Sequence, residues 1–220
     1  MRIRLMVLLV VVAIDVGFAQ TQRAVPRLAD GHPDLSGVWS TVRTLEFPTP
    51  AMLPWAEALT KERMANSSTQ PPPSERCLPS GVLRFTDPFK LVHTPTLLLV
   101  LPDDDVPAVR QVFLDGRAHP SYLQPTWTGH AIGSWDGETL IVERVGFNNE
   151  LWIDRFGHPH TEMLKVIEKY RRPAFDRLEF ESTIDDPKTY VRPWTVKRTA
   201  TLATDIDVNE FIWDPRDCKK

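Results

Sequence analysis

The sequence predicts a mostly antiparallel β domain, either a barrel or a sandwich. From residue 82 onward, about nine or ten short apolar runs follow one another with turn residues between them and no helical segment. Twenty prolines against ten glycines disfavour a helical bundle, because proline breaks helix interiors but is tolerated at strand ends and turns. Asp136-Gly137 between two apolar runs is a strong hairpin signal.

The first 19 residues have the pattern of a secretory signal peptide. Arg2 and Arg4 form a positive start, residues 5–13 are apolar, and small residues precede a cleavage site at Gln20. A membrane anchor would need about 20 apolar residues, and this run is too short. We therefore expect removal of residues 1–19, a periplasmic or secreted protein, and no membrane span in the mature chain.

Residues 20–81 are expected to form an extended arm, a first strand at 35–41, one helix at 51–66 and a proline-rich linker at 67–81. The helix would place an apolar stripe against the domain, made of Met52, Trp55, Leu59 and Met64.

Residues 82–220 are expected to form the main barrel, closed by the first strand. The strands are predicted at 89–92, 96–101, 109–114, 130–135, 139–145, 162–171, 177–184, 195–202 and 208–213. In the strand at 177–184, Leu178, Phe180 and Ile184 alternate with charged residues, which indicates one buried face and one solvated face.

Composition narrows the partners and the covalent chemistry. A formal net charge of −3 without a basic stripe argues against nucleic acid. The two cysteines, Cys77 and Cys218, predict one disulfide in an exported chain, and two free thiols are the alternative. No dinucleotide, phosphate-loop or haem-attachment motif is present, so we expect no organic cofactor.

The richest candidate site is the stretch from Gly157 to Glu162. In extended chain His158, His160 and Glu162 share one face, because side chains alternate with a period of two. Following the same parity onward places Val166, Glu168 and Tyr170 on the inner face, with His160 and Glu162 at the mouth of the interior. These residues could be an acid/base pair or a substrate site. They could also be a metal site made of His158, His160 and Glu162, or simply a polar loop.

Two further clusters contain titratable side chains. Arg117 could bind an anion and His119 could move a proton, or Arg117 could simply clamp the turn by pairing with Asp115. His130 shares a face with Ile132 and Ser134, and Glu143 lies between Ile141 and Val145. Both could therefore face the interior, where a buried carboxylate needs a partner.

Aromatic residues are abundant enough to line a pocket for a flat apolar molecule, although they also fill barrels. The expected substrate-binding residues are His119, Asp115, Trp127, Trp135, Trp152, Asp154 and Tyr170.

Several motifs together resemble a large family of exported bacterial proteins without an assigned activity. The motifs are Pro-Asp-Leu-Ser-Gly-Val-Trp at 33–39, Arg-Cys-Leu-Pro at 76–79, Phe-Leu-Asp-Gly-Arg-Ala-His-Pro at 113–120, Pro-Thr-Trp-Thr-Gly-His-Ala-Ile-Gly at 125–133, Gly-Phe-Asn at 146–148, His-Pro-His-Thr at 158–161, and Thr-Ile-Asp-Asp-Pro at 183–187 through Pro-Trp-Thr at 193–195. The resemblance covers nearly all of the mature chain. In that family a cysteine follows the last strand, near position 213, whereas here Cys218 lies further on.

More distantly, Gly37-x-Trp39 is similar to the opening motif of lipocalins and other calycin barrels. That resemblance implies a closed antiparallel barrel around one small ligand. We therefore expect a lipocalin-like barrel with the N-terminal arm and one helix outside it.

The sequence supports three functional hypotheses. The first is an acid/base lyase, isomerase or hydrolase acting on a small apolar or aromatic molecule, with His130, His160, Glu143 and Arg117 as catalytic residues. The second is a carrier of the same shape without chemistry. The third is a metal-dependent enzyme that uses His158, His160 and Glu162.

Overall fold

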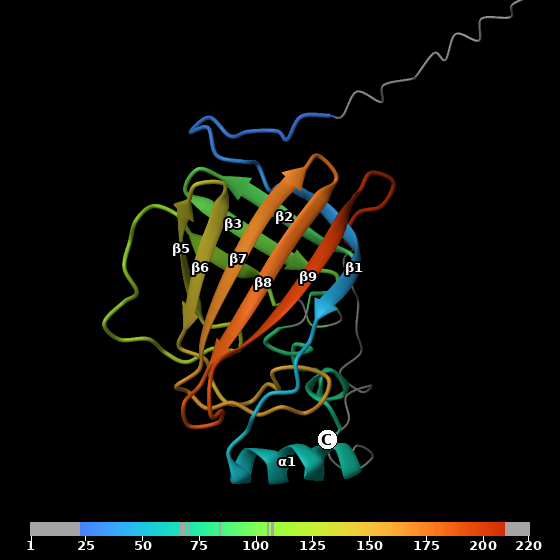
Figure 1. Cartoon of the computed structure of the whole chain (residues 1–220), viewed down its shortest axis with the longest axis vertical. Helices are drawn as coiled ribbons and strands as arrows, with labels where there is room; N and C mark the ends of the chain where they lie inside the picture. The colour runs from blue at the N-terminus through green and yellow to red at the C-terminus, as the bar shows by residue number, and fades with distance from the viewer. Residues whose placement is uncertain are drawn as a thin grey trace, which may run out of the picture.

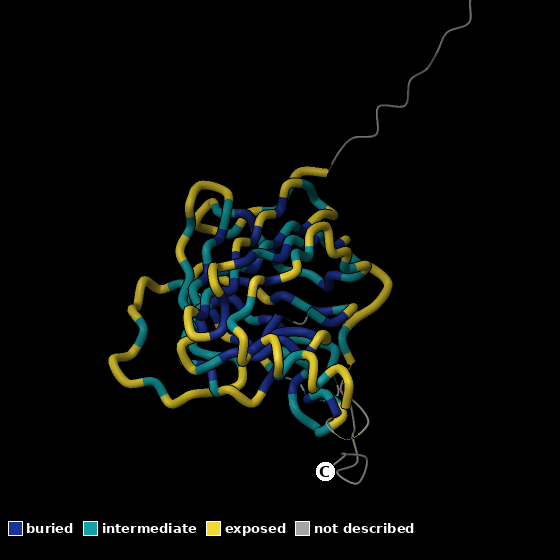
Figure 2. Tube along the Cα trace, turned by 60° about the horizontal axis from the view of Figure 1, so that its bottom comes forward, coloured by how far each residue is buried: buried dark blue, intermediate teal, exposed yellow. Residues whose placement is uncertain are grey.

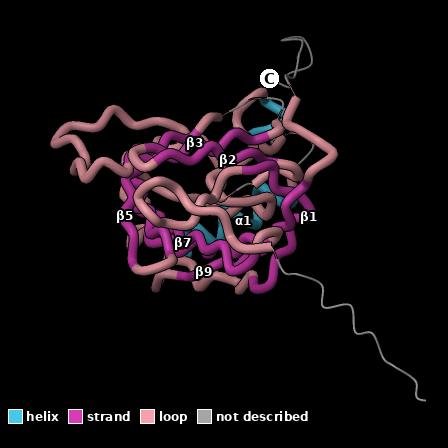
Figure 3. The backbone as a smooth tube through the Cα atoms, turned by 90° about the horizontal axis from the view of Figure 1, so that it is seen from above, coloured by secondary structure: helices cyan, strands magenta, loops and turns pink. Residues whose placement is uncertain are grey.

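The computed structural model describes residues 23–66, 69, 71–83, 85–104, 106 and 108–209. These residues form a closed β-barrel in which nine strands follow one another around the ring in chain order. Figure 3 shows the ring from above. The lipocalin-like barrel with a single α-helix that the sequence predicts is confirmed.

The strands are β1 (Gly37–Glu46), β2 (Phe89–Thr94), β3 (Leu97–Pro102), β4 (Arg110–Phe113), β5 (His130–Asp136), β6 (Thr139–Val145), β7 (Lys165–Ala174), β8 (Arg177–Asp185) and β9 (Trp194–Ala203). The helices within the described ranges are α1 (Pro54–Ala65) and a short 3-10 helix, η1 (Pro73–Arg76). The expected hairpins β2–β3 and β5–β6 and the alternating burial of β8 are confirmed. Of the strand expected over 208–213, only residues 208–209 are described, and they are not in a strand.

One seam of the barrel is parallel, where the sequence predicts antiparallel pairing. Val112 of β4 lies opposite Ala131 of β5, and Phe113 lies opposite Ile132. Two parallel neighbours need a crossover connection that returns the chain to the same end. Residues 114–129 make that return as the long loop at the left of Figure 1.

The N-terminal arm crosses one end of the barrel, at the top of Figure 1. Arg27 donates two hydrogen bonds to the carboxylate of Glu138, at 3.1 and 3.0 Å. The ring of His32 stacks on Trp135 with centroids 4.5 Å apart. The arm therefore lies against the β5–β6 hairpin.

Helix α1 lies beyond the opposite end of the barrel (Figure 1). It contacts the domain through Ala56, which is fully buried, and through the Trp55 indole N–H, which donates to Lys188 O at 2.8 Å. The predicted apolar stripe is wrong in part, because Trp55 and Met64 are 43% and 49% exposed. The helix begins at Pro54 and contacts the loop that contains Lys188, so it packs on the loops at this end of the barrel.

Two predictions fall outside the described residues. Residues 1–19, where we expect a signal peptide, are not among the described residues, so the signal peptide, its cleavage and export stay predictions. Cys77 closes η1 and is not a free thiol, but Cys218 is not among the described residues, so the Cys77–Cys218 pairing also stays a prediction.

The buried residues form two apolar clusters along the barrel axis, and the exposed residues lie mostly in loops (Figure 2). The first cluster fills the end under the N-terminal arm, around Trp39, Phe89, Tyr170 and Phe180. The second cluster surrounds Phe147, Leu164 and Trp194 at the end that faces α1.

A charged group lies inside the barrel, between the apolar residues. Glu168 of β7 is 1% exposed, and its Oε1 accepts hydrogen bonds from Arg110 of β4 and Arg144 of β6, both at 3.0 Å. The Tyr170 hydroxyl donates to Oε2 at 2.9 Å. Burial alone would raise the pKa of Glu168, but the two guanidiniums lower it, so the carboxylate is ionised. The inward parity expected for Glu168 and Tyr170 is confirmed.

Removing the Glu168 carboxylate should destabilise the fold strongly. Glu168→Ala leaves two buried guanidiniums without their shared acceptor, and we expect a loss of roughly 3–5 kcal/mol in the free energy of unfolding in urea. The control is Glu179→Ala, whose carboxylate pairs at the surface with Arg177 and should contribute only about 0–1 kcal/mol. Equal losses in the two variants would contradict a structural role for the buried group.

Candidate functional site

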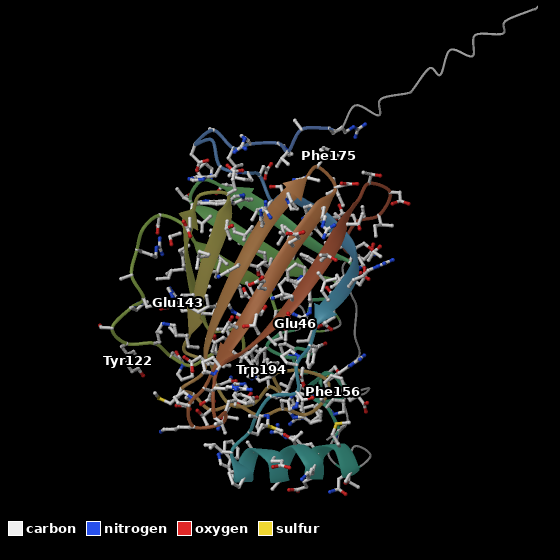
Figure 4. All side chains as sticks on the ribbon, viewed as in Figure 1. Glu46, Tyr122, Glu143, Phe156, Phe175 and Trp194 are labelled. Carbon is white, nitrogen blue, oxygen red and sulfur yellow. The ribbon has the colours of Figure 1, made fainter. Side chains whose placement is uncertain are left out.

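A cavity of about 500 Å³ lies at the end of the barrel that faces α1, on the β1 and β9 side. This volume is in the range of small-molecule sites. Figure 4 shows Phe156 in the loop below this end, near the ends of β1 and β9 that carry Glu46 and Trp194. The lining residues are Val42, Thr44, Phe47, Ser80, Leu83, Phe85, Asp87, Asp154, Arg155, Phe156 and Arg198.

The apolar wall of the cavity comes from three phenylalanines on separate segments. Phe47 follows β1, Phe85 precedes β2, and Phe156 lies in the loop before β7. Phe47 and Phe156 meet edge to face with ring centroids 5.4 Å apart. Aromatic faces arranged in this way suit a flat apolar ligand.

The cavity has two carboxylates, and both are engaged. Asp87 accepts hydrogen bonds from the Ser40 hydroxyl and from the N–H groups of Thr41 and Val42. It therefore holds the backbone of β1 at Thr41, whose φ is 54°. The second carboxylate, Asp154, accepts from the Phe156 N–H at 2.8 Å and contacts His158.

Asp154 and His158 form a buried carboxylate–imidazole pair. The His158 Nδ1 lies 2.6 Å from Asp154 Oδ2, and both residues are less than a tenth exposed. A carboxylate at Nδ1 fixes that nitrogen as the proton carrier and leaves Nε2 for proton transfer. From the sequence we expect Asp154 in the binding site, and His158 on a face that is an acid/base pair, a metal site or a polar loop.

Phe85 and Ser80 also line a second, water-sized cavity of about 30 Å³. Its wall includes Arg110 and Arg144, the two partners of Glu168. The Arg110 guanidinium lies over the Phe85 ring, 4.5 Å from its centroid. Phe85 therefore stands between the charged interior of the barrel and the larger cavity.

The structure does not assemble the suggested metal site. Glu162 is exposed, whereas His158 and His160 are buried. His158 is bound to Asp154, and the Nδ1 of His160 contacts Thr161 O at 3.1 Å. Over the described ranges, no group of three or more histidine, cysteine, aspartate or glutamate side chains is arranged to hold a metal ion.

His119, His130 and Glu143 meet on the outer wall of the barrel, not inside it. The Nδ1 atoms of His119 and His130 are 2.8 Å apart, and His119 Nε2 lies 3.5 Å from Glu143 Oε1. Lys165 Nζ contacts the other oxygen of Glu143 at 2.5 Å. The expectation that His130 and Glu143 face one cavity with His160 is therefore wrong.

The cause of that error is the choice of parity in β6. Every residue of β6 is apolar or neutral except Glu143 and Arg144, so either face of the strand could be the inner one. Arg144 is inside because Glu168 is there to neutralise it. Glu143 consequently points outward, together with its register partner Ile132 and, two residues along β5, His130.

Arg117 clamps the turn by pairing with Asp115, which is the second of the two roles that the sequence suggests for it. Its Nε and Nη2 both donate to the carboxylate of Asp115, and its guanidinium lies over Phe113, 4.0 Å from the ring centroid. Phe113 in turn stacks on His130 with centroids 5.4 Å apart. The pair is exposed at the start of the long loop and lies outside the barrel interior.

The remaining predicted substrate-binding residues are scattered. Trp127 is in the long loop and donates to Glu150, Trp135 lies under the arm against His32, and Trp152 is buried against Arg63. Tyr170 is in the charged core. Of the predicted site residues, only Asp154 lines the larger cavity.

Sequence reasoning missed Arg198, Phe47 and Phe85. Arg198 lies two residues from both Val196 and Ala200 in β9 and therefore shares their buried face, so the strand pattern predicts its inward position. The segments that contribute Phe47 and Phe85 are loops, and nothing in their sequence indicates that they meet.

Comparison with known proteins finds no matching family model, no matching curated protein and no matching solved structure. Within the described ranges, the chain contains no helix that is both apolar and long enough to cross a membrane. What the cavity can do follows from its own residues.

The His119–His130 contact should be visible by NMR. Burial, the neighbouring His119 and the Arg117 guanidinium all lower the pKa of His130, so its imidazole should titrate below the ordinary value of about 6.5. Arg117→Gln should raise that midpoint, because it removes one of the nearby positive charges. Arg155→Gln, the same change at the other end of the barrel, should leave it in place. A midpoint that does not move in Arg117→Gln would contradict this electrostatic coupling.

Proposed function

We propose that the protein binds a small apolar or aromatic molecule in the cavity at the α1 end of the barrel. The observation that carries the proposal is the cavity of about 500 Å³ with Phe47, Phe85 and Phe156 in its wall. Small-molecule sites are concave, mostly apolar and contain a few placed polar groups. The rest of the interior is filled by the two apolar clusters and the Glu168 group.

The opposite end of the barrel differs from the α1 end. The N-terminal arm covers it, with Arg27 bound to Glu138 and His32 stacked on Trp135. Access to the interior is therefore favoured from the α1 end, where Phe156 and Thr44 are exposed.

Binding can be tested with the neutral fluorophore N-phenyl-1-naphthylamine. We expect saturable binding with a blue-shifted, enhanced emission, because the aromatic wall removes the probe from water. Thr44→Trp places an indole at the rim of the cavity and should weaken binding by at least about tenfold through a direct clash.

The matched control for this experiment is Arg43→Trp. Arg43 is exposed on the same strand but is not among the residues that line the cavity, so the added indole should not affect the probe. Absence of saturable binding to the unmodified protein would contradict the proposal, as would equal losses in the two variants.

A second candidate function is acid/base catalysis in the same cavity, and the Asp154–His158 pair is the observation that favours it. Asp154 lines the cavity and holds His158, which lies behind it and is not itself a lining residue, at Nδ1; this arrangement orients an imidazole for proton transfer. This pair takes the place of the predicted His130–His160 pair. Its reaction would be a hydrolysis, an elimination or an isomerisation without an organic cofactor.

Catalysis can be tested with two aromatic substrates. Hydrolysis of 2-naphthyl acetate releases 2-naphthol, and dehydration of 3-hydroxy-3-phenylpropanoate releases cinnamate and water, so each product can be followed by its absorbance. We expect His158→Gln to lower whichever rate is present by roughly 10²–10⁴. His32→Gln, at the other end of the barrel, is the control. The same small effect in both variants would exclude the pair as the proton carrier and leave binding alone.

The proposed setting is the periplasm or the cell exterior. The arginines, the apolar run and the small residues of positions 1–19 support export, and an exported chain supports the Cys77–Cys218 pairing.

A further inference from the structure

Arg198 is the one cavity-lining cation that the fold also buries. It is 9% exposed and takes an inward position of β9, in register with Phe180 of β8 on one side and Thr44 of β1 on the other. Arg155, the other cation of the lining, is exposed to solvent. The guanidinium of Arg198 therefore belongs to the inner wall of the cavity.

Part of this guanidinium has no acceptor among the described residues. Arg198 Nη1 is buried and has no hydrogen-bond partner within the described ranges. Other buried guanidiniums of the barrel are engaged: Arg144 donates to Glu168 and to Thr128 O, and Arg172 donates to three backbone carbonyls. An unsatisfied buried cation is costly, and such groups are normally paired.

The nearby carboxylates are already committed to other groups. Glu168 is held by Arg110, Arg144 and Tyr170, and Asp154 is held by His158 and the Phe156 N–H. Among the ion pairs of the described residues, Glu168 pairs with Arg110 and Arg144 and Asp154 pairs with His158, and neither pairs with Arg198. Arg198 thus has a donor without a partner among the described residues, and the residue lines an aromatic cavity.

We propose that Arg198 binds the anionic group of the ligand, and that the ligand class is small aromatic or apolar carboxylic acids. This inference rests on the proposed binding function and specifies its ligand. A planar guanidinium matches a carboxylate in bidentate geometry, and the three phenylalanines accommodate the apolar body.

The charge state of Arg198 agrees with this role. Burial lowers its pKa to about 10, while Glu168 and Asp154 oppose that shift. The group is therefore positively charged at neutral pH, and a bound carboxylate would relieve the cost of its burial. Binding of an anion that depends on this charge should weaken as the pH rises through about 10, since the charged form is then lost.

The test uses two probes of the same shape, 2-naphthoate and its neutral isostere 2-naphthamide, in which an NH2 group replaces one carboxylate oxygen, with affinities measured by calorimetry. A hydrogen-bonded charge pair predicts that the unmodified protein binds the carboxylate about 10–100 times more tightly than the amide. Arg198→Met should reduce this ratio to near one without weakening the amide, and Arg198→Lys should keep part of it. Lys197→Met is the control, because it removes the neighbouring cation, which pairs outside with Glu46.

Thermal unfolding separates anion binding from a structural role. Because the empty site buries an unsatisfied charge, Arg198→Met should raise the Tm of the ligand-free protein by roughly 2–4 °C. A lower Tm would indicate that Arg198 holds the fold together and would overturn the proposal, as would an unchanged carboxylate-to-amide ratio in Arg198→Met.

The outcomes for the two proposals are distinct. If N-phenyl-1-naphthylamine binds and Thr44→Trp blocks it, while Arg198→Met does not alter the carboxylate-to-amide ratio, only the anion site is wrong. If neither the neutral probe nor the naphthoate binds to the unmodified protein, the binding function fails and the ligand class fails with it.

Discussion

The buried carboxylate of Glu168 determines which face of three strands is inside. It brings Arg110 of β4 and Arg144 of β6 to one point on the inner face of β7. A one-residue slip of β7 would leave both guanidiniums unpaired in the core, and a slip of β4 or β6 would remove one of the two ion pairs. Through Glu168, Arg110 also ties β4 to β6 and β7, across the parallel β4–β5 seam. The ladder between β4 and β5 consists of only two residue pairs. An ionic contact thus supports the part of the barrel that backbone pairing supports least.

The outward position of His130 follows from the same constraint. With Arg144 inside, Glu143 is outside, and its register partner Ile132 is outside with it. His130 has the parity of Ile132, so it also points outward, where it meets His119 from the long loop. His130 and Glu143, which we expect from the sequence to face one cavity with His160, therefore belong to a surface cluster with His119.

The sequence was informative where periodicity is strict and ambiguous where it is not. In β8, Leu178, Phe180 and Ile184 alternate with charged residues, which predicts a single inner face. The structure buries these three residues. In β6 both faces are apolar until residues 143 and 144, so a local pattern could not choose between Glu143 and Arg144. The choice depended on Glu168, on another strand, whose inward position had been predicted without being used to place a buried cation. The cavity wall was still less accessible to prediction, because Phe47, Phe85 and Phe156 come from loops whose meeting depends on the closed barrel.

The two ends of the barrel interior satisfy polar groups in different ways. Around Glu168 the polar groups bond to one another: one carboxylate accepts hydrogen bonds from two guanidiniums and a tyrosine hydroxyl, and the cavity beside them holds little more than a water molecule. Beyond Phe85, toward α1, the cavity is larger, and Arg198 has a buried nitrogen without an acceptor in the part of the chain that the structure describes. A barrel selected for stability alone would place an apolar residue at that position, because replacing a buried, incompletely paired charge by an apolar side chain is commonly neutral or stabilising. Unsatisfied groups of this kind persist where function requires them. Glu168, whose oxygens are bonded to side chains of the fold, thus marks the part of the barrel that stabilises the fold. Arg198, which has a nitrogen without a partner among the described residues, marks the part that is open to a ligand.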